Sequence, residues 1–180
     1  MTHITITGDL GSGKSAVSRL LSETLGYAIV STGSIQRSLA AERGMTTLEL
    51  NKYTESHPEI DDLIDDGIRR FADIAESHII DSRLAWFFLP SSFKVYLTVE
   101  PEIAADRILG DAARGRTEAY ATREAAMSAL AERKRRENAR FLSYYGADCT
   151  DLSRFDFVTD TSHSSPSAVA ARILSAYRKA

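Results

Sequence analysis

Short runs of β-branched and apolar residues recur along the chain and predict five β-strands. The runs are HITIT (3–7), YAIVS (27–31), HIID (78–81), FKVYLTV (93–99) and FDFVTD (155–160). Between the first two, apolar residues follow the spacing of an amphipathic helix over 17–25, and Gly26 is placed to end that helix. Residues 3–31 are therefore predicted to form a strand, a loop, a helix and a second strand, which implies a parallel sheet.

Helical patterns also separate the later strands, and Ser165 followed by Pro166 marks the start of the last helix. This alternation predicts a single α/β domain over 1–180, with three layers (α/β/α), a five-stranded parallel sheet and ligands at the carboxyl ends of the strands. Two helical insertions, 34–75 and 110–146, are too long for simple crossovers and are candidates for mobile elements that cover a substrate. The core of the domain would then comprise residues 1–33, 76–109 and 147–180.

The composition is ordinary for a globular chain with one sizeable core: 180 residues, 43% of them hydrophobic and 26% charged. Cys149 is the single cysteine and the four histidines are scattered, so we expect no intrachain disulfide and no zinc cluster. A reducing, cytoplasmic setting follows. The first residues lack a basic stretch before an apolar run, and no segment reaches the roughly 18 apolar residues that cross a bilayer, so we expect neither secretion nor membrane insertion.

The net charge of −3 argues against a general nucleic-acid binder, but the charge is unevenly distributed. Between Arg107 and Arg140 there are nine basic and five acidic residues, so this segment carries +4 and the remainder −7. Such a segment suits a small polyanion as ligand. A solvated helix face with mixed charges would give the same pattern, and charge alone does not decide between the two.

The sequence GDLGSGKS at 8–15 follows the first predicted strand and satisfies the phosphate-loop pattern G-x-x-x-x-G-K-[ST]. Its glycines let backbone N–H groups turn inward, and the following helix adds the positive end of its dipole. Lys14 would reach the β- and γ-phosphates of a nucleoside triphosphate, and the Ser15 hydroxyl would bind Mg²⁺. The predicted ATP-binding set is Gly8, Asp9, Leu10, Gly11, Ser12, Gly13, Lys14, Ser15 and Ala16.

Asp81 ends the third predicted strand, where a carboxylate could join Ser15 in the magnesium shell. The alternative is that Asp81 caps the turn that follows it.

A second anion site is predicted directly after the second strand, in STGSIQR. A helix starting at Gly33 would offer N–H groups to a phosphate, and Arg37, about one turn on, could hold it with a bidentate fork. An ordinary helix start with an exposed arginine is the alternative, and the phosphate loop in the same chain favours the anion site.

Together, GDLGSGKS and VSTGSIQR resemble the nucleoside monophosphate kinases. From residue 3 to about 175 the chain is similar, more specifically, to the short cytidylate kinases of archaea and their bacterial relatives. The stretches that carry this resemblance are ERGMTTLELNKYTESHPEIDDLID (42–65), IIDSRLAW (79–86), EPEIAADRI (100–108), RKRRENARFLSYYGAD (133–148) and DLSRFDFVTDTS (151–162).

The resemblance implies a P-loop kinase that transfers the γ-phosphoryl group of ATP, with Mg²⁺, to CMP or dCMP. It implies that 34–75 forms the nucleotide-acceptor segment and 110–146 a lid. The implied catalytic residues are Lys14, Asp81, Arg133 and Arg140. The implied acceptor-binding residues are Ser31, Thr32, Gly33, Arg37, Asp61, Arg83 and Arg136; Asp61 and Asp65 could contact the base or be exposed helix carboxylates.

The chain departs from the family pattern at two positions. Ser82 stands where many relatives have glycine, between Asp81 and Arg83, and Asp111 stands where relatives often have a basic residue. A lid arginine could then come from Arg114 or Arg116.

Three functional alternatives stay open at this level: a kinase for another nucleotide, a modified cytidylate or a small metabolite; a nucleotide-dependent switch or assembly factor; and a catalytically idle relative. The intact Lys14, Ser15, Asp81 and Arg37 argue against the idle relative. We expect a monomer because no long apolar stripe remains once the core is assigned.

Overall fold

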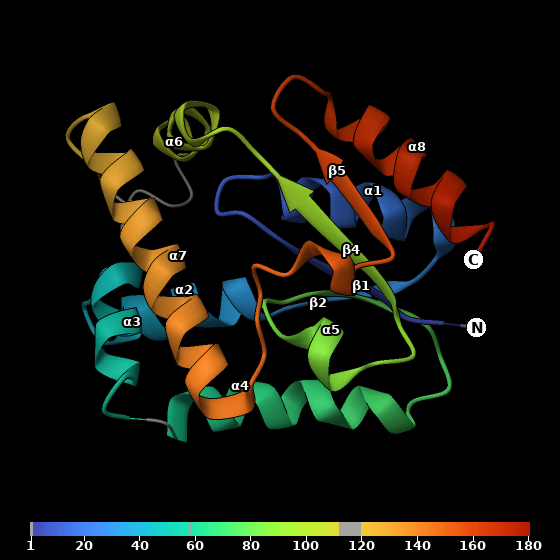
Figure 1. Ribbon diagram of the computed structural model, residues 1–180, viewed down its shortest axis with the longest axis horizontal. Coiled ribbons are helices and arrows are strands. Elements are labelled where there is room, and N and C mark those ends of the chain that lie inside the picture. Colours follow the sequence, from blue (N-terminus) through green and yellow to red (C-terminus); the bar gives the residue numbers. More distant parts are fainter. Residues whose placement is uncertain (1, 58, 112–119) are drawn as a thin grey trace.

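Five parallel strands form the centre of the protein, in the order β2-β3-β1-β4-β5 (Figure 1). The computed structural model describes residues 2–57, 59–111 and 120–180. The predicted α/β class and parallel sheet are confirmed, and each strand lies within two residues of its predicted ends. The strands are β1 (Ile4–Gly8), β2 (Ala28–Ser31), β3 (His78–Asp81), β4 (Phe93–Thr98) and β5 (Phe157–Asp160).

The register of the sheet brings the carboxyl ends of the central strands together. Asp81 at the end of β3 lies opposite Ile6 of β1 on one side and Ser31 of β2 on the other. Gly8, the last residue of β1, lies opposite Leu97 of β4. Groups that follow these strands therefore meet at one edge of the sheet, where open α/β sheets bind ligands.

Successive side chains of the central strands point to opposite faces and both faces are buried. In β3, Ile79 belongs to the core on one face and Ile80 to the core on the other, and neither is exposed. This two-sided burial explains why the strand sequences are nearly continuous apolar runs and not alternating ones.

Helices α1 (Lys14–Leu25) and α8 (Pro166–Tyr177) cover the first face. Gly26, with φ of 72°, ends α1, and the Ser165 hydroxyl accepts from the Ala168 N–H at the start of α8; both helix ends were predicted. The buried core on this face comprises Ile4, Ile6, Val17, Leu21, Ile79, Phe93, Val95, Leu97, Val169, Ala170 and Ile173.

The second face is covered by α4 (Glu59–Arg69), α5 (Ala85–Phe88) and the end of α7 (Arg123–Tyr145). Ile68, Ala85 and Leu89 pack on Ile80. Beside this cluster, Trp86 is buried and its Nε1–H donates to the backbone carbonyl of Arg83 at 3.0 Å. The second cluster on this face comprises Leu84, Trp86, Tyr96, Phe141, Ala147, Cys149 and Phe155.

The first predicted insertion is helical, as expected. It contains α2 (Thr32–Glu42), α3 (Thr47–Thr54), α4 and the 3₁₀-helix η1 (Arg70–Asp73). The predicted start of α2 at Gly33 is wrong by one residue, because Ser31 is the N-cap and its hydroxyl accepts from the Ser34 N–H, so the helix begins at Thr32.

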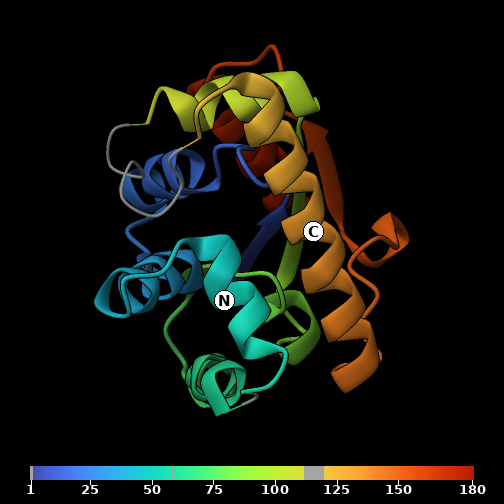
Figure 2. The ribbon, with the colours of Figure 1, turned by 90° about the vertical axis from the view of Figure 1, so that its left-hand side faces the viewer.

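The second insertion is helical over α7, which follows α6 (Pro101–Leu109) and precedes the short η3 (Leu152–Arg154). Figure 2 shows α7 running alongside α3, so the two insertions contact each other over the carboxyl edge of the sheet. Arg114 and Arg116 lie outside the described residues. In the described parts of the chain, every helix is too short or too polar to cross a membrane.

Candidate active site

The phosphate loop connects β1 to α1 and packs closely against α6. Gly11 has φ of 78°, and a Cβ placed on it would lie 2.8 Å from the Cα and carbonyl oxygen of Ala104. Gly13, with φ of 82°, is the N-cap of α1. Glycine is therefore required at residue 11 by backbone conformation and by space, and the loop has one arrangement against α6.

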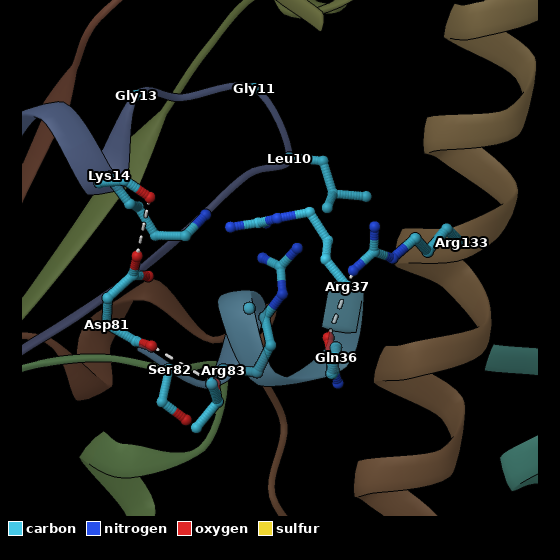
Figure 3. Close-up of a pocket in the computed structure, with 13 residues that line it drawn as sticks. Leu10, Gly11, Gly13, Lys14, Gln36, Arg37, Asp81, Ser82, Arg83 and Arg133 are labelled. Carbon is cyan, nitrogen blue, oxygen red and sulfur yellow. Dashed lines mark hydrogen bonds between the residues drawn. The ribbon is translucent and has the colours of Figure 1, made fainter. Parts of the chain in front are cut away.

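Lys14 folds back over the loop. Its Nζ donates to the carbonyl oxygens of Gly8 at 3.2 Å and of Asp9 at 3.0 Å. Figure 3 shows the ammonium group facing the space between the phosphate loop and α2. The positive charge thus lies at the mouth of the loop, where a bound phosphate would be.

Asp81 holds the start of α1 and the end of β2 together. Its Oδ2 accepts from the Ser15 hydroxyl at 3.3 Å and from the Ser31 hydroxyl at 3.4 Å, and the side chain is buried. The turn after β3 is capped by Ser82, whose hydroxyl accepts from the Leu84 N–H at 3.4 Å. The Asp81 carboxylate is therefore directed to Ser15, the arrangement expected of a shared cation site.

Four cationic side chains from four separate segments line one pocket beside the loop: Lys14, Arg37, Arg83 and Arg133. Asp81 is the one carboxylate among the residues that line it, which makes the pocket strongly positive. Figure 3 shows the cationic groups directed toward a common space. Such a pocket can hold a polyanion between opposite walls. The backbone around it includes the predicted Gly11, Gly13, Ser15, Thr32 and Gly33.

Arg83 is fixed through its Nε, which pairs with Glu137 Oε2 at 3.0 Å. One terminal nitrogen of the same guanidinium donates to the carbonyl oxygen of Gly8. Ser82, between Asp81 and Arg83, has a buried side chain that caps the turn. Arg83 therefore lies beside the phosphate loop and lines the pocket.

Arg133 reaches the same pocket from α7. Its Nε donates to Glu137 Oε1 at 2.8 Å and its Nη2 donates to Gln36 Oε1 at 3.4 Å. Burial by itself raises the pKa of Glu137, but the guanidinium groups of Arg83 and Arg133 more than offset this and lower that pKa to about 2. Glu137 is therefore ionised and completes two charge-assisted pairs.

Two other arginines predicted for the site lie elsewhere on α7. Arg140 is buried and donates from Nη1 to the backbone carbonyl and the side-chain Oδ1 of Asn51, both at 3.2 Å. Arg136 lies on another side of the helix, paired with Glu55 at 2.7 Å and with Glu132 at 2.9 Å. Neither Arg140 nor Arg136 lines the pocket formed by Lys14, Arg37, Arg83 and Arg133.

The two carboxylates considered for base contact are on α4. Asp61 is in that helix, but its side chain lies outside the described part of the structure. Asp65 is not an exposed helix carboxylate: it is buried and its Oδ2 accepts from the Tyr145 hydroxyl at 2.6 Å. Asp65 thus joins α4 to the end of α7.

Asp9 belongs to the loop, but its carboxylate points away from the pocket. It accepts from the Tyr96 hydroxyl at 3.0 Å and the Val99 N–H at 3.2 Å, and it pairs with Lys134 Nζ at 2.5 Å. Burial and the adjacent carboxylate raise the pKa of Tyr96, which stays a hydrogen-bond donor. Asp9 therefore anchors the phosphate loop to β4 and α7.

Sequence reasoning missed Gln36, Asn51 and Glu137. Glu137 lay within a run of basic residues and was counted only as charge. The signal that could have found it is spacing, because residues 133, 137 and 140 share one face of a helix, so a glutamate there is flanked by two arginines one turn away on either side.

The fold matches solved structures of low sequence identity. An uncharacterised protein of Eubacterium ventriosum gives a TM-score of 0.73 at 15% identity, over 100% of both chains. A shikimate kinase of Bacteroides thetaiotaomicron gives 0.68 at 12% identity, over 98% of both chains. At these identities the likeness is one of fold alone.

Relatives in sequence are much closer. The cytidylate kinase of Pyrococcus furiosus is 38% identical over 96% of this chain and 86% of its own length. The cytidylate kinase of Sulfurisphaera tokodaii is 39% identical over 97% of this chain and 93% of its own length. The sequence pattern of the AAA domain family matches residues 4–128. With a phosphate loop, a paired Ser15 and Asp81 and three arginines about one pocket, the chain belongs to the AAA domain family and, within it, to the cytidylate kinases.

Proposed function

We propose that the protein transfers the γ-phosphoryl group of ATP to CMP or dCMP, giving ADP and the cytidine diphosphate. The observation that carries the proposal is the convergence of Lys14, Arg37, Arg83 and Arg133 on one pocket at the carboxyl edge of the sheet. Lys14 belongs to the donor loop, and the arginines come from α2, the end of β3 and α7. Family membership supplies the cytidylate acceptor.

On the donor side, backbone N–H groups of 8–15 would bind the phosphates of ATP, and Lys14 would exchange its carbonyl partners for phosphate oxygens. Ser15 and Asp81 fit a magnesium ion, because a hydroxyl and a carboxylate oxygen lie 3.3 Å apart and Mg²⁺ prefers one or two such oxygens with phosphate and water. The bound ion would neutralise charge on the β- and γ-phosphates.

On the acceptor side, Arg37 and Arg83 would hold the α-phosphate of the monophosphate, with Thr32 and Gly33 at the start of α2 beside it. Arg133 would face the transferred group. Phosphoryl transfer needs little covalent help from protein, so alignment and charge neutralisation supply most of the catalysis. We propose that 34–75 acts as the acceptor segment and 110–146 as the lid that excludes water.

A panel of acceptors tests the proposal. Purified protein with Mg²⁺ and ATP is offered CMP, dCMP, UMP, AMP, GMP, shikimate and gluconate, and both products are separated and identified. We expect CMP and dCMP to be used well above every other compound. Preference for another acceptor, or ATP hydrolysis with no acceptor consumed, would contradict the proposal.

The Lys14→Ala variant is the matched control for chemistry at this site. It should lose activity by several orders of magnitude while its circular dichroism spectrum is unchanged. The reason is that the Lys14 ammonium group would neutralise negative charge on the phosphates and is not needed for folding.

We also propose that the protein acts as a monomer in the cytoplasm, on nucleotides and not on nucleic acid. The net charge of −3 argues against nucleic acid as a ligand, and the single cysteine is typical of a protein in a reducing setting. Light scattering coupled to size exclusion would check the monomer, with a mass of 19.8 kDa expected.

A further inference from the structure

Glu137 occupies a position where a carboxylate is costly unless it is fully paired. Its side chain is 2% exposed, inside a contact between α7, α3 and the segment after β3. Oε1 accepts from Arg133 Nε at 2.8 Å and from Asn51 Nδ2 at 3.0 Å, and Oε2 accepts from Arg83 Nε at 3.0 Å. Both oxygens are therefore satisfied, by three different elements.

Glu137 holds both arginines through the same atom, Nε. Glu137 takes the Nε of Arg83 and the Nε of Arg133, which are the inner nitrogens of each guanidinium. One terminal nitrogen of each extends farther: Arg83 Nη1 donates to the Gly8 carbonyl oxygen in the phosphate loop, and Arg133 Nη2 donates to Gln36 Oε1 in α2. One carboxylate thus sets the orientation of two guanidinium groups that line the same pocket.

Asn51 extends this arrangement to the acceptor segment. It is buried in α3, its Nδ2 donates to Glu137 and its Oδ1 accepts from Arg140 Nη1 at 3.2 Å. The chemistry of these partners fixes the orientation of the amide, since a carboxylate needs a donor and a guanidinium needs an acceptor. Asn51 therefore joins α3 to two side chains of α7.

We propose that Glu137 is a positioning residue that aligns Arg83 with Arg133 for phosphoryl transfer, and that Asn51 makes this alignment depend on the contact between α3 and α7. The inference rests on the proposed function, because it assigns the alignment to that reaction. Glu137 and Asn51 act through the arginines and do not touch the substrate. When α3 of the acceptor segment packs against α7, Asn51 reaches Glu137, and Arg83 and Arg133 are held in their aligned positions.

A double-mutant cycle between Glu137→Gln and Arg83→Ala tests whether Glu137 aligns Arg83. Glutamine can still accept from Arg133 and Asn51 through its carbonyl oxygen, but its NH₂ group faces Arg83 Nε, so the alignment of Arg83 is lost. We expect kcat/KM for CMP phosphorylation to fall about 100-fold in the wild-type background, as for loss of a preorganised donor, and less than about threefold in the Arg83→Ala background.

Two further measurements separate alignment from general damage. The Kd of an ATP analogue should change less than about twofold in Glu137→Gln and in Asn51→Leu, because, among the described residues, these two side chains bind arginines and helix groups and not the phosphate loop. Glu124→Gln, in the exposed first turn of α7, is the matched control and should leave kcat/KM within about twofold of wild type.

Asn51→Leu tests whether the alignment depends on the contact between α3 and α7. It also keeps the proposal testable if Glu137→Gln fails to fold. It removes both side-chain hydrogen bonds from Asn51 to α7 without removing a charge. We expect kcat/KM to fall about tenfold in the wild-type background and less than about threefold with Arg83→Ala.

Equal losses in both backgrounds, for either substitution, would overturn the inference and leave Glu137 and Asn51 as purely structural residues. Weakened binding of the ATP analogue in parallel with activity would overturn it as well. Failure of the proposed function would appear earlier and differently, in the acceptor panel with wild-type protein. If that panel identifies another acceptor, the cycle is measured with it.

Discussion

Ser15 Oγ donates to Asp81 Oδ2 across 3.3 Å, although 66 residues separate them in the sequence. The contact exists because β3 is the neighbour of β1, so the end of one strand lies beside the loop that leaves the other. A hydroxyl and a carboxylate are thereby presented together at the first turn of α1, next to Lys14.

Asp81→Asn should raise the Mg²⁺ concentration required for activity. The amide oxygen can still accept from Ser15 and Ser31, so local structure is kept while the negative charge is lost. We expect the midpoint of a magnesium titration of activity to rise about tenfold or more, which corresponds to about 1.4 kcal/mol. An unchanged midpoint would show that Asp81 has no part in binding the ion.

Arg37→Ala should weaken use of the acceptor and spare the donor. Loss of a charge-assisted hydrogen bond of about 1.5–3 kcal/mol predicts that KM for CMP rises by roughly 10- to 150-fold. Calorimetry with an ATP analogue should give the wild-type Kd. Arg43→Ala, an exposed arginine just after α2, is the control and should alter neither value. Equal losses for both nucleotides would contradict the assignment of Arg37 to the acceptor.

Gly11→Ala should destabilise the protein more than Gly26→Ala does. Both glycines have φ above 70°, so both substitutions carry the strain of about 1–2 kcal/mol for a left-handed residue. A Cβ at residue 26 meets open space, whereas at residue 11 it meets the backbone of Ala104 at 2.8 Å, which cannot move aside without displacing α6. Thermal unfolding of the two variants would check this, and equal Tm values would contradict it.

Lowering the pH should remove the contribution that ionised Glu137 makes to the free energy of unfolding. The folded protein lowers the pKa of Glu137 from 4.5 to about 2, so its ionisation favours folding above pH 4.5, and this contribution is lost as the pH falls from 4.5 toward 2. At about 1.4 kcal/mol per pKa unit the whole contribution is about 3 kcal/mol. Urea unfolding of wild type and Glu137→Gln at several pH values should show the difference between them shrinking in acid; parallel curves would contradict this assignment.

The sequence predicted the elements of the fold well and their order in the sheet not at all. Each strand is signalled locally, by β-branched residues that suit a buried pleated surface. That β3 enters between β1 and β2 depends on packing between segments far apart in the chain, and no local pattern carries it. Ile29 illustrates this: it belongs to an apolar run but is 40% exposed, because β2 is an edge strand.

The site divides in the same way. Lys14, Ser15, Asp81 and Arg37 lie in short motifs next to strand ends, where spacing alone indicates chemistry. The roles of Asn51 and Glu137 depend on a hydrogen bond between them, and the two residues are 86 positions apart in the sequence. In the sequence alone, each is an ordinary polar residue of a helix. Arg133 and Arg136 are three residues apart, and only the structure shows which one faces the pocket.

Trp86 is the single tryptophan of the chain, and its indole N–H is bound to the carbonyl of Arg83. All tryptophan fluorescence of the protein therefore comes from one side chain, which is hydrogen-bonded to the backbone of Arg83. If Arg83 holds the acceptor as proposed, a shift of its backbone on binding would alter this hydrogen bond and with it the emission of Trp86. Stopped-flow fluorescence of the unlabelled protein would then follow acceptor binding separately from chemistry.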